Sequence, residues 1–544
     1  MAVDQQRGRI GVIISGSLTE GLSARVDAAH PIESLRVGQF LLVEGRQHEF
    51  FAMLTDVELG ATSPAVLVDP PADDAFLQDV FAGTATYATI ALRPSLMLPR
   101  DHSDEMRPVK TIPAHFAPVY TADEKDFTRV FGREDDTHFE IGRPLDMDVP
   151  VCIDLARFVE RSNGVFGKSG TGKSFLTRLL LSGTMRSGIA TNLIFDMHSE
   201  YGSDATSEGG GFVKGLRKIF GPSVRIYTLD PESTRRRGGQ YDHDIRIGLN
   251  EIDVEDILLI SDELNLTATA AESAYRLVDH YKNDWLRTLL DMTPEALDAF
   301  ALNTGTHAGS LGALKRKLEA LRRRGYVEDT AKASVINTLI DALMARQHVV
   351  LEFGKFDHSI DYMLVANIIT RKIHQRWRER TEAYLTSKNP ADKPPQLVIT
   401  IEEAHKFLNP QAAKQTIFGT IAREMRKYSV TLLVVDQRPS SIDSDVMSQL
   451  GSRITALLND EKDIDAVFTG VSGSSALRTV LATLDSRQQC LILGHAVPMP
   501  VVVRTRPYDE AFYAAMAVHV PAVAGNRPPD ALPVAPTIDD LFGD

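Results

Sequence analysis

The first part of the chain carries short runs in which apolar and polar residues alternate. These runs are GRIGVIIS, GLSARVD, GQFLLVEGRQHEFFAMLTDVEL and ATYATIAL, and they lie between Gly8 and about Ala91. A period of two, broken by Gly, Asp and Pro, predicts short antiparallel strands, and no long amphipathic helix interrupts them. We therefore expect a small β-barrel over residues 1–95 and a proline-rich linker or strap over residues 96–150.

From about residue 150 onward, apolar strand-like runs alternate with helical stretches. The runs SNGVFG, TNLIFDMH and SVRIYTLD come first, and QHVVLEFG, QLVITIEEAH, SVTLLVVDQRPS, RITALLN, QQCLILG and PVVVRT come later. This alternation predicts a parallel α/β sheet. Residues 251–346 instead show helical periodicity, which predicts a helical bundle inserted into the sheet domain. We expect the core over residues 151–250 and 347–510, and an Ala- and Pro-rich tail over 511–544.

Charge and cysteine content restrict how the protein can contact nucleic acid and in which compartment it is expected. The chain has 59 Lys+Arg against 73 Asp+Glu and a formal net charge of −14. Any contact with nucleic acid is therefore expected to be confined to a local basic surface such as a groove or pore. Two cysteines, Cys152 and Cys490, cannot form a disulfide framework, and no apolar run reaches about 18 residues. We expect a cytoplasmic protein without a membrane segment.

The strongest local motif lies between a strand and a helix at residues 167–174. GKSGTGKS fits G-x-x-x-x-G-K-[ST], the phosphate-binding P-loop. Glycines let backbone N–H groups turn toward a phosphate, and the following helix adds its positive end. Lys173 is expected to bridge the β- and γ-phosphates of ATP, and Ser174 to ligate Mg²⁺. The expected nucleotide-binding residues are Gly167, Ser169, Gly170, Thr171, Gly172, Lys173, Ser174 and Phe175.

Two carboxylates end the buried strand QLVITIEEAH. Because ligands of parallel sheets bind at the carboxyl ends of the strands, Glu402 and Glu403 are expected beside the P-loop. Glu402 would hold the Mg²⁺ shell, and Glu403 would polarise the attacking water. The alternative is that both glutamates only begin a helix as favourable charges. His405 either reports the nucleotide state or is an ordinary hydrogen-bonding histidine.

Polar residues around the next strand complete the candidate catalytic set. Gln437 ends TLLVVDQ and can contact the γ-phosphate. Arg423 and Arg426 precede that strand at helical spacing, on one face of a predicted helix. They are either a solvated helix face or an arginine finger for the neighbouring subunit, with Arg426 preferred and Arg423 as the runner-up.

Three other charged segments have less specific patterns. Lys406 and Lys414, in KFLNPQAAK, either line a central pore and contact DNA phosphates or belong to a plain surface loop. FDMHSEYG brings Glu200 near the nucleotide or nucleic acid, or simply forms a turn at the strand end. The basic cluster over residues 315–324 reads as a solvated helix face.

With these motifs in order, the chain resembles the HerA family of hexameric ATPases in the FtsK–HerA group of DNA pumps. The resemblance rests on GVFGKSGTGKS, FDMHSEYG, VITIEEAHKFLNP, IAREMRKYSV, VVDQRPSSID and LILGHAVPMPVVVRTRP, and it covers nearly the whole chain. The EEAH form of the carboxylate strand is usual in that family. The fold class that follows is α/β, with a RecA-like P-loop ATPase core, an inserted helical bundle and a preceding small β-barrel.

The resemblance implies a homohexameric ring that translocates along or unwinds double-stranded DNA with ATP and Mg²⁺. It also implies a partner, either a nuclease of the NurA type in DNA end processing or another effector enzyme in antiphage defence. The alternative function is an ATP-dependent assembly platform that activates a partner enzyme. Lys173, Glu402, Glu403 and Gln437 favour turnover, because a scaffold needs no hydrolytic glutamate. A P-loop kinase of small molecules fits the barrel and the bundle less well.

Overall fold

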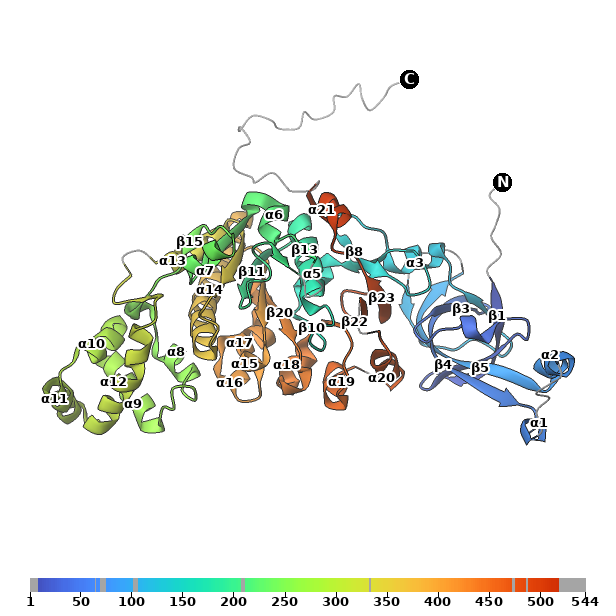
Figure 1. Ribbon diagram of the computed structural model, residues 1–544, viewed down its shortest axis with the longest axis horizontal. Coiled ribbons are helices and arrows are strands. Elements are labelled where there is room, and N and C mark those ends of the chain that lie inside the picture. Colours follow the sequence, from blue (N-terminus) through green and yellow to red (C-terminus); the bar gives the residue numbers. More distant parts are fainter. Residues whose placement is uncertain are drawn as a thin grey trace, which may run out of the picture.

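The structure is a computed structural model that describes residues 8–63, 65–68, 75–100, 106–206, 211–331, 334–471, 475–485 and 488–517. Three parts follow one another along its long axis (Figure 1). A β-barrel lies at one end, an α/β core in the middle and a helical bundle at the other end. The core therefore separates the two smaller parts, although the bundle is inserted within the core's own sequence.

The N-terminal part is a closed antiparallel sheet. Its strands are β1 (Arg9–Ser17), β2 (Gly21–Val26), β3 (Phe40–Glu44), β4 (His48–Ala61), β5 (Thr86–Pro99), β6 (Arg107–Pro108) and β7 (Pro118–Thr121). They pair in the order β2-β1-β7-β3-β4-β5-β6, and an additional β2–β5 pairing closes the barrel. Alternate residues such as Ile10, Leu41 and Ile90 are fully buried inside it, as the period of two predicts. Helices α1 (Ala65–Val68) and α2 (Ala75–Thr84) lie in the connection between β4 and β5.

The segment over residues 96–150, expected as a strap, contributes to both neighbouring parts. Strands β6 and β7 belong to the barrel sheet, and β8 (His138–Arg143) belongs to the large central sheet. Between them, α3 (Glu124–Phe131) begins with a capping box in which the Asp123 and Asp126 side chains each accept a backbone N–H at 2.9 Å. Strands β6 and β7 have two and four residues and lie among prolines, which leaves little periodicity in the sequence and explains why they were not expected.

The central sheet has the order β15-β14-β18-β11-β19-β20-β10-β21-β22-β23-β8-β9. Its further strands are β9 (Val151–Asp154), β10 (Asn163–Phe166), β11 (Thr191–Asp196), β14 (Val224–Thr228), β15 (His243–Asp244), β18 (His348–Glu352), β19 (Leu397–Glu402), β20 (Val430–Asp436), β21 (Ser452–Thr455), β22 (Gln489–Gly494) and β23 (Val501–Thr505). Every neighbouring pair from β15 to β21 is parallel, and the pairs from β21 to β9 are antiparallel. The parallel strands therefore bring their carboxyl ends to one edge of the sheet.

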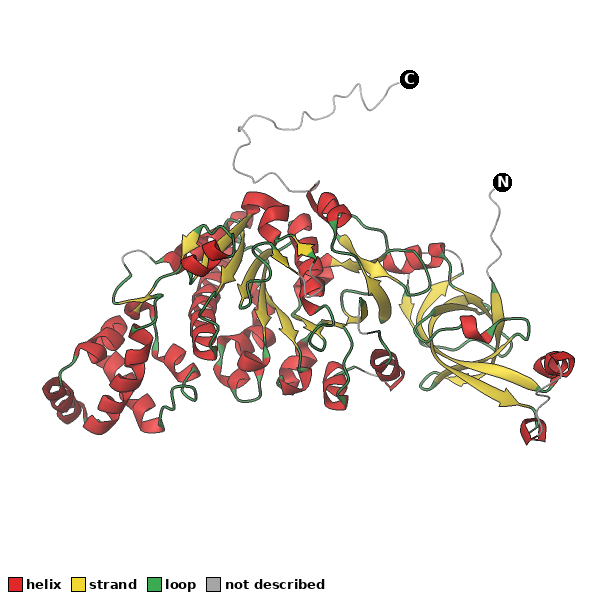
Figure 2. Cartoon of the chain, viewed as in Figure 1, coloured by secondary structure: helices red, strands yellow, loops and turns green. Residues whose placement is uncertain are grey.

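Helices flank this sheet (Figure 2). They are α4 (Leu155–Glu160), α5 (Lys173–Ser187), α6 (Leu216–Phe220), α7 (Pro231–Arg236), α13 (Val335–Met344), α14 (Ser359–Ser387), α15 (His405–Leu408), α16 (Ala412–Gln415), α17 (Ile417–Glu424), α18 (Ser444–Gln449), α19 (Glu461–Val467), α20 (Ser475–Ala482) and α21 (Glu510–Ala517). Short 3₁₀ turns and two-residue bridges complete the connections, among them η6 (Met425–Tyr428), η7 (Pro439–Ser441), β12 (Ala205–Thr206) and β13 (Phe212–Val213).

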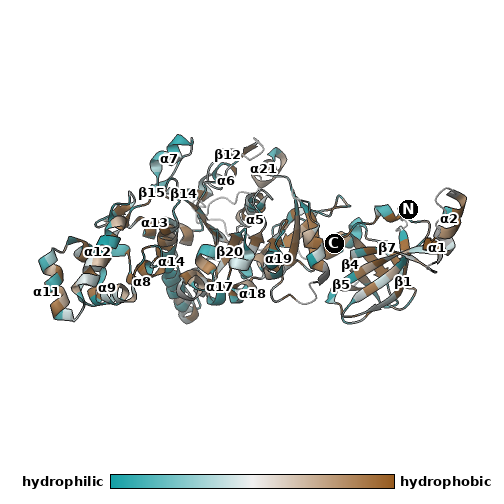
Figure 3. Cartoon of the chain, turned by 60° about the horizontal axis from the view of Figure 1, so that its bottom comes forward, coloured by the Kyte–Doolittle hydropathy of each residue, from teal (hydrophilic) through white to brown (hydrophobic). Residues whose placement is uncertain are grey.

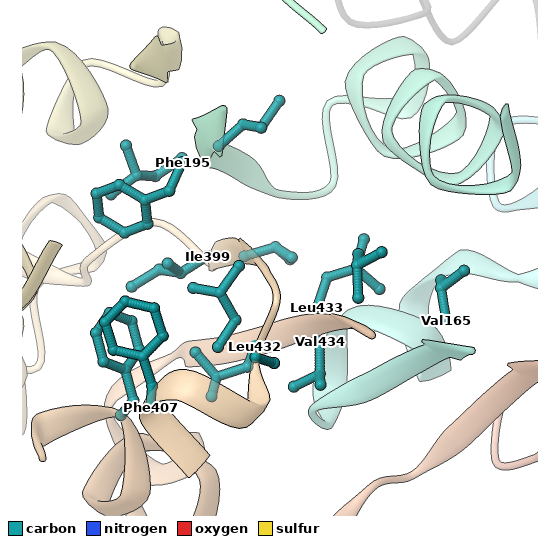
Figure 4. Packing of buried hydrophobic residues seen from close by; sticks show 14 of the residues in the cluster. Val165, Phe195, Ile399, Phe407, Leu432, Leu433 and Val434 are labelled. Atoms are coloured by element: carbon teal, nitrogen blue, oxygen red, sulfur yellow. The ribbon is translucent and has the colours of Figure 1, made fainter. Parts of the chain in front are cut away.

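The core between sheet and helices is built from continuous apolar strands. Phe195, Ile399 and Leu432 come from three adjacent strands and point into one cluster with Phe407 (Figure 4). The ring of Phe407 lies 4.6 Å from that of Phe418 on α17. Strands that are buried on both faces read as unbroken apolar runs, which is why the sequence located them well.

The inserted bundle consists of α8 (Val254–Leu259), α9 (Ala268–Tyr281), α10 (Trp285–Asp291), α11 (Pro294–Thr304) and α12 (Ala308–Arg322). Leu311, Leu314 and Leu318 are fully buried on one stripe of α12. The indole of Trp285 is buried and donates to the carbonyl of Ile252 at 3.0 Å, which holds α10 against the segment that leads into α8. The barrel, the mixed sheet with helices and the inserted bundle confirm the predicted fold class.

The hydropathy of the chain follows this architecture. Brown, hydrophobic segments are concentrated in the strands of the barrel and the sheet, and the surface helices show teal, hydrophilic stripes (Figure 3). Within the described residues, every helix is too short or too polar to cross a bilayer.

Candidate nucleotide-binding site

The loop over residues 167–172 joins the buried strand β10 to the first turn of α5. Gly170 has φ +75° and Gly172 has φ +95°, left-handed conformations that a residue with a side chain adopts only at a cost. A Cβ atom on Gly167 would lie 2.9 Å from Cβ of Ala456, so the loop passes close to the neighbouring segment. Because Gly172 provides no side-chain cap, the first N–H groups of α5 are available for an anion.

Lys173 lies over this loop. Its Nζ donates to the carbonyl of Lys168 at 3.0 Å, and the hydroxyl of Thr171 donates to the same carbonyl at 2.7 Å. Burial lowers the pKa of Lys173, while the nearby carboxylates of Glu403 and Asp436 favour its charged form. Ser174 is half-buried in the first turn of α5, and Phe175 packs its ring 6.2 Å from that of Tyr508.

Strand order places the carboxylates of the EEAH segment near the P-loop. β19 pairs with β20, and β20 pairs with β10, so β20 lies between them. Phe166, the last residue before the P-loop, is in register with Asp436, and Glu402 is in register with Val435. The acidic strand end and the phosphate-binding loop therefore share one edge of the sheet, separated by a single strand.

Glu402 is a buried carboxylate, and the described residues satisfy only one of its oxygens. The hydroxyl of Tyr201 donates to its Oε1 at 2.9 Å, whereas Oε2 has no hydrogen-bond partner among the described residues. Burial, with the negative charges of Asp196 and Glu200 adding to it, raises the pKa of Glu402 well above its ordinary value. An orphaned oxygen of this kind suits a cation or an ordered water.

The FDMHSEYG segment forms the turn that delivers Tyr201 to Glu402. The buried carboxylate of Asp196 accepts backbone N–H groups of Glu200 at 2.7 Å, Tyr201 at 2.8 Å and Gly202 at 3.3 Å. Burial, together with repulsion from Glu352, raises the pKa of Asp196 to about 7. The expectation named Glu200 in this segment and missed Tyr201, because the tyrosine and its partner are 201 positions apart.

Glu403 is held in a rare backbone conformation beside two polar side chains. Its φ is +47°, in the left-handed region, which costs a non-glycine residue on the order of 1 kcal/mol or more. The amide of Gln437 donates to its Oε1 at 3.1 Å, and Nε2 of His405 lies 3.8 Å from its Oε2. The structure thus brings together Glu403, Gln437 and His405, three of the residues singled out in the sequence.

Asp436 was not singled out from the sequence, although it organises this cluster. Its carboxylate is fully buried and accepts the backbone N–H of His405 at 2.7 Å and that of Arg438 at 2.7 Å. It also lies 3.0 Å from Nδ1 of His405, and this hydrogen bond is the main cause of the raised pKa of His405. A buried acid at the end of an apolar strand is the signal that could have found it.

Arg426, the preferred finger candidate, lies away from the P-loop of its own chain. Arg426 precedes β20 and forms an ion pair with Glu160, which precedes β10, so both lie at the amino ends of the strands. Arg423 donates to the carbonyl of Ala413 at 3.0 Å. Helix α17 ends at Glu424 and Arg426 lies in the 3₁₀ turn η6, so the two arginines do not share one continuous α-helix face as expected.

The segment of the expected pore loop folds into two short helices, α15 and α16. Nζ of Lys406 lies 3.9 Å from Sδ of Met197, and the side chain is half-buried. Lys414 lies in α16, and its side chain is outside the described residues. The tail is likewise described only to Ala517.

Most of the basic cluster of the bundle is engaged within the chain. Lys315 and Lys317 donate to the carbonyls of Met292 and Asn265, and Arg322 pairs with Asp291 at 2.8 Å. These contacts agree with the interpretation of this run as an ordinary solvated helix face.

Comparisons with known proteins find similar sequences. A family model described as "Helicase HerA, central domain" matches residues 139–373. The chain is 25% identical over 431 residues to the DNA double-strand break repair helicase HerA of Pyrococcus furiosus, covering 72% of this chain and 73% of that protein. It is 24% identical over 507 residues to the protein of the same name from Sulfolobus acidocaldarius, covering 92% and 93%.

Solved structures with similar folds include VirB4 and the plasmid coupling protein TrwB. VirB4 of Thermoanaerobacter pseudethanolicus is 16% identical with a TM-score of 0.45, and the match covers 69% of this chain and 97% of VirB4. The plasmid coupling protein TrwB in complex with ADP and Mg²⁺ is 13% identical with a TM-score of 0.43, covering 71% and 92%.

Proposed function

Because the chain is a HerA-type P-loop ATPase, we propose that it is a ring-forming motor that hydrolyses ATP to move along or unwind double-stranded DNA. The observation that carries this proposal is the clustering of Lys173, Glu402, Glu403 and Gln437 at one edge of the sheet. A protein that only binds nucleotide has no need of a second, strained glutamate beside the phosphate-binding loop.

The donor set at this edge fits ATP together with Mg²⁺. Oε2 of Glu402, which has no partner in the part of the chain that the structure describes, and the hydroxyl of Ser174 are oxygen ligands of the kind that Mg²⁺ prefers. When bound, Mg²⁺ would neutralise charge on the β- and γ-phosphate oxygens. Lys173 would exchange the carbonyl of Lys168 for phosphate oxygens, which repays the cost of its partial burial.

Within this proposal, Glu403 acts on the attacking water. Its carboxylate is three-quarters buried, with side-chain exposure of 25%, and can accept a proton or orient water beside the γ-phosphate. Gln437 already contacts that carboxylate and has a second amide N–H with which to contact the γ-phosphate. The backbone N–H groups of the loop and the start of α5 would hold the β-phosphate.

The proposal also includes a ring of subunits and a path for DNA through it. The curated relatives are named DNA double-strand break repair helicases, and the resemblance of the chain implies a homohexamer with DNA in a central pore. A net charge of −14 restricts phosphate contacts to local positions such as Lys406 and Lys414. A partner nuclease of the NurA type, or another effector in antiphage defence, would supply any cutting.

Position favours Arg426 as a finger in trans. Strand β20 has seven residues and spans roughly 23 Å at about 3.3 Å per residue, so Arg426 cannot reach the P-loop of its own chain. Its side chain is 54% exposed, and an always-charged, planar donor suits the charge that develops in phosphoryl transfer. In a ring, this arginine would complete the site of the next subunit.

The testing experiment measures ATP hydrolysis with and without linear duplex DNA. Wild type is expected to hydrolyse faster with DNA, Lys173→Ala to lose nucleotide binding or hydrolysis, and Glu403→Gln to bind ATP without turnover. Equal rates with and without DNA, together with ATP-dependent activation of a partner enzyme, would instead support the assembly platform.

A further inference from the structure

We propose that His405, anchored by the buried carboxylate of Asp436, is a positioning residue that holds the Glu403 carboxylate in place from the side opposite Gln437. The inference rests on the proposed function, in which Glu403 acts on the attacking water. It adds two residues, Asp436 and His405, to the apparatus of hydrolysis and gives each a distinct part.

The anchor is the contact between Asp436 and His405. Oδ2 of Asp436 lies 2.7 Å from the backbone nitrogen of His405 and 3.0 Å from its Nδ1. Oδ1 is occupied by the backbone N–H of Arg438 at 2.7 Å. A buried carboxylate accepts only, so Nδ1 of His405 carries a hydrogen and the ring orientation is fixed.

This orientation directs the other ring nitrogen at Glu403. Nε2 of His405 lies 3.8 Å from Oε2 of Glu403, while Oε1 accepts from Gln437 at 3.1 Å. The two oxygens of one carboxylate thus face two different side chains. The groups facing His405 are Asp436, Glu403 and Lys406, and the two carboxylates favour its imidazolium form, in which both ring nitrogens donate.

The backbone gives a reason for this support. Glu403 adopts φ +47° between the end of β19 and α15, and such strain persists only where surrounding contacts over-determine it. The hydrogen bonds of Asp436 to the backbone and ring of His405 fix the turn two residues later. ATP hydrolysis is faster when the carboxylate that acts on the attacking water is held in one orientation, because a misplaced group loses effective molarity.

Two substitutions at His405 separate positioning from a purely structural role. His405→Asn keeps an amide near the position of Nδ1, and so keeps the bond to Asp436, but cannot reach Glu403. His405→Gln places its amide near the position of Nε2, and so keeps a donor to Glu403 while losing the ring's bond to Asp436. If His405 positions Glu403, His405→Asn should have the lower ATPase activity. If His405 has only a structural role, His405→Gln should have the lower activity.

The assay is steady-state ATP hydrolysis with duplex DNA, with thermal melting to compare folding of the variants. His405→Asn is expected to lower kcat by about 10- to 100-fold, the usual effect of losing a supporting residue, with little change in KM for ATP. His405→Gln is expected to retain more activity than His405→Asn. In the Glu403→Gln background, His405→Asn is expected to cause no further loss in single-turnover hydrolysis, because the group that it positions is already gone.

Each outcome has a defined meaning. The inference would be overturned if His405→Asn had the wild-type kcat, or if His405→Asn were more active than His405→Gln. It would also be overturned if His405→Asn caused an equal further loss of hydrolysis in the Glu403→Gln background. These results would leave the proposed function standing as long as Glu403→Gln is inactive. A Glu403→Gln protein that hydrolyses ATP at the wild-type rate would overturn the catalytic assignment of Glu403 and this inference with it.

Discussion

Replacing Tyr201 with Phe tests how the buried carboxylate at the end of β19 is prepared for a cation. The hydroxyl of Tyr201 donates to Oε1 of Glu402 at 2.9 Å, and both side chains are buried. Tyr201→Phe removes this single contact and leaves the ring in place. The Glu402 carboxyl then has no side-chain hydrogen bond among the described residues, since Oε2 is already unpartnered.

The size of the effect follows from these contacts. A hydrogen bond to a charged group contributes about 1.5–3 kcal/mol, which corresponds to about 10- to 150-fold in an equilibrium constant. Loss of a residue that orients a metal ligand weakens metal binding by about 10- to 100-fold. The bond from Tyr201 also lowers the pKa of Glu402, so its removal favours a protonated carboxyl that competes with Mg²⁺. We expect the half-saturating Mg²⁺ concentration to rise by roughly tenfold or more, and by more at lower pH.

The assay is ATP hydrolysis as a function of free Mg²⁺ at saturating ATP. Tyr362→Phe is the matched control, because the Tyr362 hydroxyl is equally buried but contacts the backbone of Glu402, donating to its carbonyl at 3.1 Å and accepting from its nitrogen at 3.2 Å. Both variants are expected to lose stability, and only Tyr201→Phe to shift the Mg²⁺ dependence. An equal shift in both variants, or none in Tyr201→Phe, would refute a specific role for the tyrosine.

Three further predictions concern the assembly, the DNA contact and the pH dependence of stability. Arg426→Ala should bind ATP but lose turnover by about 10³-fold. Mixing Arg426→Ala with Glu403→Gln subunits should restore activity above that of either mutant alone, and no recovery in confirmed mixed rings would count against a site shared between subunits. Changing Lys406 and Lys414 to Glu should weaken DNA binding and flatten the dependence of log K on log salt by about one unit per lost phosphate contact, and unaltered affinity and stimulation would remove the pore assignment. Burial lowers the pKa of His348 from 6.5 to about 4, so the unfolded chain takes up this proton at a higher pH than the folded chain, and stability falls as the pH drops through that range. In urea unfolding, His348→Asn should reduce this loss of stability by on the order of 3 kcal/mol. An unchanged pH dependence of stability in the variant would contradict the prediction.

The sequence located the elements whose signals are local. The P-loop and the EEAH segment are contiguous motifs at the ends of apolar strands, and a parallel sheet necessarily brings such ends to one edge. The bundle over residues 251–346 and the barrel strands also have clear periodicities. These features could therefore be predicted without knowing which strands are neighbours.

What the sequence could not supply depends on contacts between distant segments. Asp436 is in register with Phe166 only because β20 pairs with β10, and Tyr201 meets Glu402 only because β11 pairs with β19. Strand β7 has only four residues, too few for a period to appear. Arg426 was placed on an α-helix because spacing alone does not distinguish α from 3₁₀ turns.

Displacement of a third strand from linear duplex DNA tests the proposed motor most directly. A protein that moves along the duplex strips off a triplex-forming oligonucleotide in its path. Wild type with ATP is expected to release the oligonucleotide, and Glu403→Gln, which should lose at least about 10²-fold in hydrolysis while still binding ATP, is expected to release almost none. Wild-type protein that hydrolyses ATP without releasing the strand, or release at equal rates by Glu403→Gln, would contradict the account.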